Sequence, residues 1–356
     1  MKQQWREFLQ NAGAELDGEC VGSFGNPERE LQVATTGTVL SDLSHLGLIS
    51  AHGADAAAYL QGQLTCDVRE VTAQRSRLGA HCTHKGRAQA LFRLFKRGDS
   101  YYLQLPAALV DESIQRLRKY VLMSKITLED AGDALVRFGY AGPDAAAHLQ
   151  EALGAVPSEV DAVVQTPDLL AIRLPGIHPR FELAGELEAA QRLWQLLDVH
   201  AAPVGAAPWG LLDVLAGLPN VYPETVETFV PQMLNLHAIG GVSFIKGCYT
   251  GQEVVARTEY LGKLKRRMYL GHIGGERLPR PGEALYAPDC QSGQGTGTVV
   301  DAQPYPDGGF ELLAVIQSAS VDAGGVRLGD AHGPPLEIRE LPYPLGAENT
   351  QQQVDR

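Results

Sequence analysis

The sequence predicts an α+β protein made of two related α+β units followed by a smaller antiparallel β domain. First, Gly53–Gln61 (Gly-Ala-Asp-Ala-Ala-Ala-Tyr-Leu-Gln) recurs as Gly142–Gln150 (Gly-Pro-Asp-Ala-Ala-Ala-His-Leu-Gln). Second, each copy follows an apolar run, opens a helical pattern, and continues through strand-like runs to an amphipathic helix. Third, short strand-like runs separated by Gly/Pro/Asp clusters begin at residue 264, a pattern typical of a small barrel or sandwich.

The element order within each copy supports a duplication. Chance similarity between two alanine-rich helix starts is the alternative, but both copies share the order strand, helix, strand, strand, helix. Two α+β units packed side by side leave a cleft, and ligands favour such junctions.

The expected strands of the first copy are 46–51, 80–82, 88–95 and 101–105, and those of the second copy are 135–141, 169–174 and 180–183. The expected closing helices are 107–120 and 185–197. The expected C-terminal strands are 266–273, 295–300, 310–316 and 336–341.

The rest of the chain is divided by composition. An Ala-, Pro- and Gly-rich stretch at 201–208 is typical of a linker, and the polar last residues are expected to fray. The predicted organisation is a peripheral segment at 1–40, the first unit at 41–130, the second unit at 131–200, a linker and motif segment at 201–263, a β domain at 264–345 and a tail at 346–356.

Composition excludes several classes of protein. A hydrophobic content of 44% and a charged content of 20% fit a globular chain. No apolar run approaches the roughly 18 residues of a spanning helix, and Met1–Phe8 lacks the apolar core of a signal peptide. We therefore expect a cytoplasmic protein with no membrane partner. A net charge of −12 argues against direct nucleic-acid binding, which requires a basic surface.

The cysteines predict neither disulfides nor a cysteine-rich metal site. There are five, at positions 20, 66, 82, 248 and 290, scattered and without any Cys-x-x-Cys. The densest His/Cys group is His81-Cys82-Thr83-His84. Because side chains alternate between the two faces of a strand, its members do not converge, and we interpret the group as structural. No metal site is expected.

The stretch Gly240–Arg257 contains the strongest motif of the chain. An apolar run reaches a glycine-flanked turn, and Thr250 with Glu253 forms a capping-box pattern that predicts a helix starting at about Gly251. Glu253 and Arg257 have the favourable acid-first order of a helical i,i+4 pair.

Cys248 is the predicted reactive residue of this motif. It lies just ahead of the helix N-terminus and two residues after Lys246, and both positive groups would favour its thiolate form. A buried structural cysteine is the alternative, but the flanking glycines and the lysine favour a functional thiol. Such a thiol suits nucleophilic catalysis, redox sensing, or contact with a metal or cluster. His237 would be the available base for hydrolysis, although no known hydrolase context surrounds the cysteine.

Lys246–Arg257 (Lys-Gly-Cys-Tyr-Thr-Gly-Gln-Glu-Val-Val-Ala-Arg) resembles the signature of YgfZ-type folate-binding proteins, relatives of the glycine-cleavage T-protein that assist iron–sulfur enzymes. The resemblance implies a T-protein-like fold: two related α+β units around a folate cleft plus a C-terminal antiparallel β-barrel domain. It further implies a tetrahydrofolate-binding accessory protein for assembly or repair of iron–sulfur clusters, including those of tRNA-modifying enzymes. Its implied partners are folate and iron–sulfur enzymes or cluster-assembly proteins.

The resemblance also suggests folate contacts. The run Leu-Gln-Gly-Gln-Leu-Thr-x-Asp-Val before residue 69 is family-like, so Gln63, Thr65 and Asp67 are expected to line the site; turn and capping chemistry is the alternative. Trp209 matches the tryptophan that packs on the pterin, with a core position as the alternative. The basic run 263–267 is expected to hold the anionic folate tail unless it is only a solvated face. The motif residues Glu253 and Arg257, together with Arg266 of the basic run, complete the predicted folate contacts.

Two departures from the wider family bear on the reaction. The hairpin Lys85–Leu91 has no carboxylate where the aminomethyltransferases carry an aspartate. Where their glutamate grips the pterin, this chain has Leu215, with Asp213 two residues away as a possible substitute. A folate-dependent aminomethyltransferase is therefore the alternative function, and a thiol redox protein without its ligand is the third.

Overall fold

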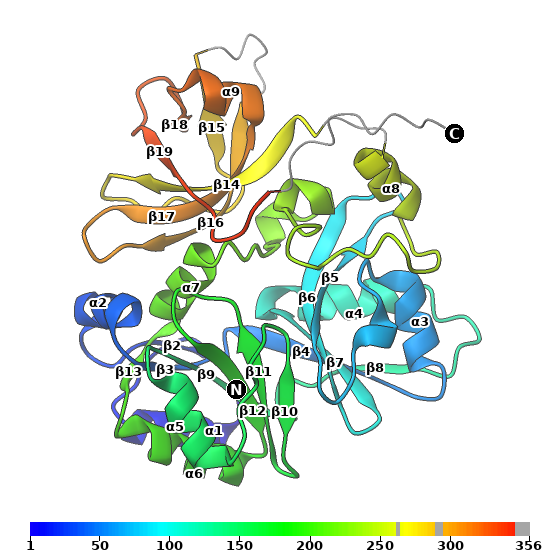
Figure 1. Ribbon diagram of the computed structural model, residues 1–356, viewed down its shortest axis with the longest axis vertical. Helices are drawn as coiled ribbons and strands as arrows, with labels where there is room; N and C mark the ends of the chain where they lie inside the picture. The colour runs from blue at the N-terminus through cyan, green and yellow to red at the C-terminus, as the bar shows by residue number, and fades with distance from the viewer. Residues whose placement is uncertain (261–263, 289–294, 346–356) are drawn as a thin grey trace.

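The computed structural model describes residues 1–260, 264–288 and 295–345. The two α+β units lie side by side, and the C-terminal sheet lies at one end of both (Figure 1). The expected tail at 346–356 falls outside the described residues. Within them, no helix is long and apolar enough to cross a membrane.

The first unit contains an antiparallel sheet of order β5-β6-β7-β4-β8. Apolar side chains of its strands and of helices α3 and α4 share one buried core. The elements are β4 Leu46–His52, α3 Ala56–Gln63, η1 Val68–Glu70, β5 Arg77–Cys82, β6 Ala88–Arg97, β7 Ser100–Pro106, η2 Ala107–Leu109, α4 Val110–Arg118 and β8 Thr127–Asp130.

The second unit repeats this arrangement in a sheet of order β10-β11-β12-β9-β3-β13. Strands β10, β11, β12 and β9 stand in the same order as β5, β6, β7 and β4, as the repeat predicts. The place that β8 takes beside β4 is taken by β3 beside β9. The elements are β9 Val136–Ala141, α5 Ala145–Leu153, β10 Val163–Gln165, β11 Leu169–Leu174, β12 Arg180–Gly185, α6 Leu187–Asp198 and β13 Ala202–Val204.

The N-terminal segment, expected to be peripheral, instead completes the second unit. Trp5 and Leu9 are fully buried, and the Trp5 indole stacks edge-on against Trp194 and donates a 2.7 Å hydrogen bond to the Asp42 carboxylate. The sequence pattern misses this because β12 covers only one edge of β9, and the strand on its other edge, β3, comes from ahead of both units in the sequence. The elements are α1 Gln3–Asn11, β1 Glu15–Asp17, β2 Cys20–Ser23, α2 Pro27–Thr36 and β3 Val39–Asp42.

The expected linker at 201–208 is also part of the fold. Strand β13 pairs in parallel with β3, and a Cβ on Gly205 would come within 2.0 Å of the Gly22 carbonyl. Helix α7 (Ala206–Leu215) then packs against α2 on one side and against β16 of the C-terminal sheet on the other. The proline and alanine residues that suggest a linker therefore lie in or next to β13 and the start of α7.

The C-terminal domain is a curled antiparallel sheet, a half-barrel, of order β18-β15-β16-β17-β14-β19. An isolated bridge between Arg327 and Pro335 draws its two edges together at one end. The predicted strands at 266–273 and 310–316 match β14 and β17 closely. The elements are β14 Arg266–Ile273, β15 Ala284–Tyr286, β16 Gly297–Pro304, β17 Phe310–Gln317, α9 Ser318–Ala323, β18 Arg327–Leu328 and β19 Leu336–Arg339.

We expect Trp5→Ala to lower the free energy of unfolding by about 3–5 kcal/mol, because it leaves a cavity among buried aromatic rings and frees Asp42 from its donor. Urea titration monitored by circular dichroism would measure the change. Gln4→Ala, on the exposed face of the same helix, is the control and should lie within about 0.5 kcal/mol of the parent. Equal effects of the two substitutions would show that α1 is peripheral after all.

Candidate functional site

Two adjoining cavities lie where the two α+β units meet. The inner one has a free volume of about 70 Å³ and is lined from both sheets and from α7. The outer one measures about 460 Å³ and shares Leu78, Arg93, Leu174 and Leu218 with the inner one. Its other walls include the loop 175–179 and Tyr343.

Buried polar side chains from facing strands line the inner cavity. Gln104 on β7 donates a 2.9 Å hydrogen bond to one carboxylate oxygen of Glu182 on β12, which joins the two sheets. The other oxygen, Oε1 of Glu182, has no hydrogen-bond partner among the described residues, and neither has Oε1 of Gln104. Burial raises the pKa of Glu182 above its ordinary value. Unpaired buried polar atoms are rare in folded proteins, so this pair is a candidate ligand contact.

Trp209 and Arg180 also line the inner cavity. The Arg180 guanidinium lies 4.6 Å from the centroid of the Trp209 ring and pairs with the Asp213 carboxylate. Within the described part of the chain, the Nε and Nη1 atoms of Arg180 have no hydrogen-bond partner. On its other side the Trp209 ring packs against Gly139, where a Cβ would come within 2.3 Å. Trp209 lines the cavity but is only 1% exposed. Its ring serves as the surface on which the Arg180 guanidinium packs.

The outer cavity contains a cation without a carboxylate partner. Arg173 lies over the Phe181 ring at 4.8 Å, and no ion pair or side-chain hydrogen bond involves it in the described part of the chain. Tyr343 donates a 2.9 Å hydrogen bond to the Gly217 carbonyl and closes the opposite wall. Anionic groups of a ligand in this cavity would find Arg173 available.

Asp161 fixes the two units against each other at the outer cavity. Its backbone adopts a left-handed conformation with φ of 67°, which is unfavourable for a non-glycine residue. Its carboxylate accepts a 2.6 Å bond from Arg93, and its carbonyl accepts one of 3.1 Å from the Ser76 hydroxyl. Strained residues of this kind concentrate at ligand sites and are retained there by surrounding contacts.

The motif segment docks on the first unit, and none of its residues lines either cavity. Helix α8 (Gln252–Tyr260) begins one residue after the predicted start. No capping bond between Thr250 and Glu253 is found in the described part of the chain; the Thr250 hydroxyl donates to the amide oxygen of Gln63 at 3.5 Å. Glu253 and Arg257 are both exposed on α8, and no ion pair between them is found among the residues that the structure describes.

Glycines allow this close docking. Gly251 has φ of +85°, and a Cβ there would come within 2.4 Å of the Thr83 carbonyl. Gly86 has φ of +69°, and a Cβ there would come within 3.0 Å of the Val254 Cβ atom. Larger residues at either position would force α8 away from the hairpin of the first unit.

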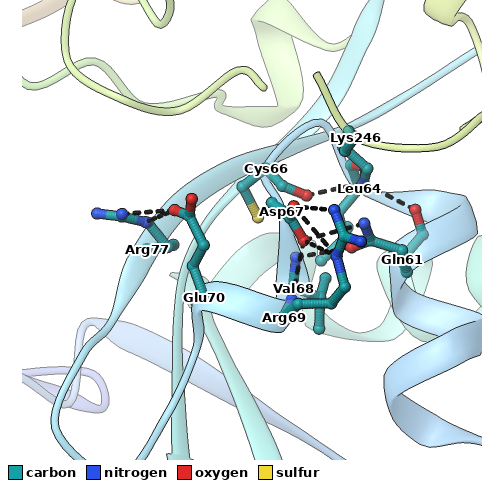
Figure 2. Close-up of polar contacts among 9 residues, drawn as sticks. All are labelled: Gln61, Leu64, Cys66, Asp67, Val68, Arg69, Glu70, Arg77 and Lys246. Atoms are coloured by element: carbon teal, nitrogen blue, oxygen red, sulfur yellow. Dashed lines mark hydrogen bonds and ion pairs between the residues drawn. The ribbon is translucent and has the colours of Figure 1, made fainter. Parts of the chain in front are cut away.

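Lys246 attaches the segment to the end of α3. Its ammonium donates hydrogen bonds of 2.7, 2.6 and 2.7 Å to the carbonyls of Gln61, Leu64 and Cys66 (Figure 2). Burial lowers the pKa of this lysine to about 8. Cations are favourable at the C-terminal end of a helix, and α3 ends at Gln63.

Cys248 is exposed while Lys246 is buried. Cys248 and Lys246 were expected to act together, but one faces solvent and the other is buried. The Lys246 ammonium donates its hydrogen bonds to backbone carbonyls. The neighbouring Ile245 is 91% exposed, so this part of the segment presents a thiol and an apolar side chain to solvent. An activated Cys248 stays a prediction that rests on the nearby helix start alone. The other described cysteines are free thiols, buried at 66 and 82 and half-buried at 20.

The polar residues after α3 are engaged in turn and docking contacts. Thr65 donates a 2.6 Å bond to the Gly241 carbonyl and accepts a 2.8 Å bond from the Ala80 amide. Asp67 accepts from the Arg69 backbone and guanidinium and from Gln61 (Figure 2). The hydrogen bond from the Arg69 side chain lowers the pKa of Asp67 to about 2. This favours the structural interpretation of the two residues.

The structure does not bring the predicted folate contacts together. Trp209 lines the inner cavity, but the others line neither cavity: Gln63, Thr65, Asp67, Glu253, Arg257 and Arg266. Arg266 lies on β14 and donates a 3.4 Å hydrogen bond to the Gly295 carbonyl. Lys263 of the basic run falls outside the described residues. No group of three or more potential metal ligands occurs among the described residues.

Sequence analysis missed the charged residues that line the cavities. Arg180 and Glu182 occupy alternate positions of one strand, so their side chains leave the same face of the sheet. A signal was present, because Arg-Phe-Glu within an otherwise apolar strand places two charges where a buried face is expected. Arg93 within β6 carries the same signal.

Comparisons with known proteins agree with this architecture. The model of the GCVT N-terminal domain family matches residues 20–164. The tRNA-modifying protein YgfZ of Yersinia pestis is 35% identical over 320 residues, which cover 89% of this chain and 96% of that protein. Its counterpart in Colwellia psychrerythraea is 33% identical over 314 residues, covering 87% and 95%. The chain belongs to the YgfZ family.

A solved structure extends the likeness to the fold. The glycine cleavage system aminomethyltransferase T of Bartonella henselae superimposes with a TM-score of 0.74 over 95% of this chain and 96% of that one, at 19% identity. This YgfZ-family chain therefore has the T-protein-like fold that its motif suggests. At such identity the likeness concerns the fold alone.

Lys246→Met should lower the free energy of unfolding by about 2–4 kcal/mol, because three carbonyls lose a charged donor while the aliphatic stem is kept. Urea titration measures the loss. Lys85→Met, on the exposed hairpin beside α8, is the matched control and should change stability by less than about 0.5 kcal/mol. If the two variants unfolded alike, the three hydrogen bonds would not secure the segment.

Proposed function

We propose that this YgfZ-family protein binds tetrahydrofolate or another reduced folate in the cleft between its two α+β units and serves iron–sulfur enzymes. The observation that supports it best is the polar inner cavity, whose buried Glu182, Gln104 and Arg180 all retain unpaired atoms. Family membership supports the role, since relatives that match nearly the whole chain are named tRNA-modifying proteins.

The residues present fit a reduced folate. A pterin is flat and has adjacent donors and acceptors on one edge, which suits a carboxylate, an amide and a guanidinium. Ligand sites commonly occupy about 300–1,000 Å³, and the outer cavity alone reaches about 460 Å³. Arg173 at that cavity suits the anionic glutamate tail. Trp209 contributes through Arg180, which it holds by a cation–π contact.

Cys248 is proposed as the group that meets the partner. It is exposed beside Ile245, so an iron–sulfur enzyme or a cluster-assembly protein can approach it without local unfolding. A thiolate can contact sulfur, iron or another thiol directly, which the cavity residues cannot do. The chain carries a net charge of −12, which disfavours direct contact with tRNA. We therefore propose that an effect on tRNA arises through the iron–sulfur cluster of a modifying enzyme.

Aminomethyl transfer is the less favoured alternative. The fold likeness to an aminomethyltransferase motivates it, but the hairpin around Gly86 has Lys85 and Arg87 and no carboxylate. Formation of methylene-tetrahydrofolate from a lipoyl-bound aminomethyl group, well above the uncatalysed rate, would establish it.

Titration with tetrahydrofolate, followed by tryptophan fluorescence or calorimetry, tests ligand binding. We expect saturable binding that Arg173→Ala weakens about tenfold, because the tail loses a charged donor. The same variant should bind a tetrahydropterin without the tail as the parent does. Arg192→Ala, an exposed arginine on α6, is the control and should bind both ligands normally. Absence of binding to the parent protein would refute the folate assignment.

Strains with a deletion, the parent gene or Cys248→Ala test the role in cells. The substitution should leave protein levels normal, because an exposed side chain beside Gly247 fills no core space. Activity of iron–sulfur enzymes and the content of thiolated tRNA should fall, most strongly under oxidative stress. If the alanine strain equals the parent while the deletion does not, the thiol is dispensable.

A further inference from the structure

We propose that the loop 119–125, between α4 and β8, is a docking surface for a partner protein that presents an apolar pocket bordered by carboxylates. The inference rests on the proposed function in one respect, because it takes this partner to be the iron–sulfur protein that meets Cys248. It adds a surface that binds the partner, and no residue of the loop lines either cavity.

The most exposed large apolar side chains of the described residues lie at the two ends of α3. Met123 is 94% exposed, Ile245 is 91% exposed and Leu122 is 88% exposed. The loop meets the start of α3, and Ile245 precedes the lysine that binds the end of α3. Both segments project beside α3 (Figure 1). Exposed apolar side chains that gather on one side of a protein mark a contact surface.

The loop is fixed at both of its ends. The Leu117 carbonyl, just ahead of the loop, accepts a hydrogen bond from the Tyr59 hydroxyl of α3. At the other end, the Lys125 amide donates a 2.7 Å bond to the Asp55 carboxylate, and the Lys125 carbonyl accepts one of 3.2 Å from the Asp55 amide. A Cβ on Gly53 would come within 2.3 Å of the same carbonyl. The exposed tip therefore stands on a fixed base, which reduces the entropy lost on binding.

Charge distinguishes this part of the chain from the molecule as a whole. Residues 116–125 include four basic residues and no acidic one, whereas the chain carries a net charge of −12. Arg116 pairs with Glu112, but no ion pair is formed by Lys119 or Lys125 among the described residues. These two exposed lysines flank the apolar tip. A complementary partner places carboxylates against the lysines and an apolar pocket against the tip.

The second unit lacks such a loop, although it has the corresponding closing helix. Helix α6 ends at Asp198, and only residues 199–201 separate it from β13. That connection contains neither lysine nor arginine. The basic and apolar loop is thus found in the copy on which the Cys248 segment docks, as expected of a surface that serves the thiol.

A protein surface fits the loop better than a lipid bilayer does. Two lysines attract an anionic bilayer weakly, and the acidic remainder of the molecule would be repelled by it. Helix α3 has eight residues and is about 12 Å long, so one partner can reach from the loop to the Cys248 segment. Its exposed positions between them include Ala57 and Ala58, whose small side chains allow close approach of another protein.

Strains carrying a deletion, the parent gene, Leu122→Ser with Met123→Ser, or Leu196→Ser with Val199→Ser test the surface in cells. The last pair is the matched control, because these exposed apolar residues lie at the end of α6. The loop variant should lower iron–sulfur enzyme activity and thiolated tRNA at least about threefold at parent protein levels, and the control should match the parent. The purified loop variant should bind tetrahydrofolate and react with iodoacetamide at Cys248 as the parent does, since the loop lines neither cavity.

A benzophenone amino acid in place of Met123 identifies what the loop contacts. Irradiated cells should yield a cross-link to an iron–sulfur protein, and Lys119→Glu with Lys125→Glu should lower this yield about tenfold. The same amino acid in place of Leu196 is the control and should not give the product. Cosedimentation of the purified parent with phosphatidylglycerol vesicles measures the lipid alternative.

The outcomes separate the docking surface from the proposed function. If the deletion strain has normal iron–sulfur enzymes, the proposed role and this partner are both wrong. If the deletion strain is defective but the loop variant equals the parent, or if no cross-link to an iron–sulfur protein forms, the role stands and the loop is not its docking surface. Cross-links between copies of this chain alone, or vesicle binding that the loop variant loses, would overturn the proposal in favour of a second copy or a membrane.

Discussion

The polar seam between the two facing sheets is the constraint on which the rest of the structure depends. Hydrogen bonds from Gln104 to Glu182 and from Arg93 to Asp161 join the units across a region where apolar contact alone would close the gap. Buried charges are costly unless they are paired, and here they are paired only in part. The seam therefore holds the units together and also leaves a cavity whose walls can still form hydrogen bonds.

The motif segment lines neither cavity, but the chain just ahead of it does: Leu236 lines the inner cavity, and Ala238 and Ile239 line the outer one. Lys246 donates hydrogen bonds to the turn after α3, and the Thr65 hydroxyl in that turn donates one to the Gly241 carbonyl of the segment. Strand β5 follows that turn and contributes Leu78 and Gly79 to the inner cavity. Cys248 itself lines neither cavity.

The seam also explains why the resemblance to the aminomethyltransferases stops at the fold. A shared backbone keeps the two units and the cleft, while the chemistry of the cleft depends on which side chains line it. In this chain the hairpin carboxylate is absent, Leu215 replaces an expected glutamate, and Glu182 with Arg180 brings charge in from β12 instead.

The sequence by itself determined the repeat, the order of strands and helices along each copy, the change to a β domain after residue 264 and the motif around Cys248. These features are local, because they depend on hydrophobic periodicity and on residues close together along the chain. Tertiary structure alone decided the rest. It placed the N-terminal segment inside the second unit, buried Lys246 away from Cys248, covered Trp209 with Arg180, and brought Gln104 to Glu182 across 78 positions. Such outcomes depend on which surfaces meet when the units pack, and no local pattern encodes that.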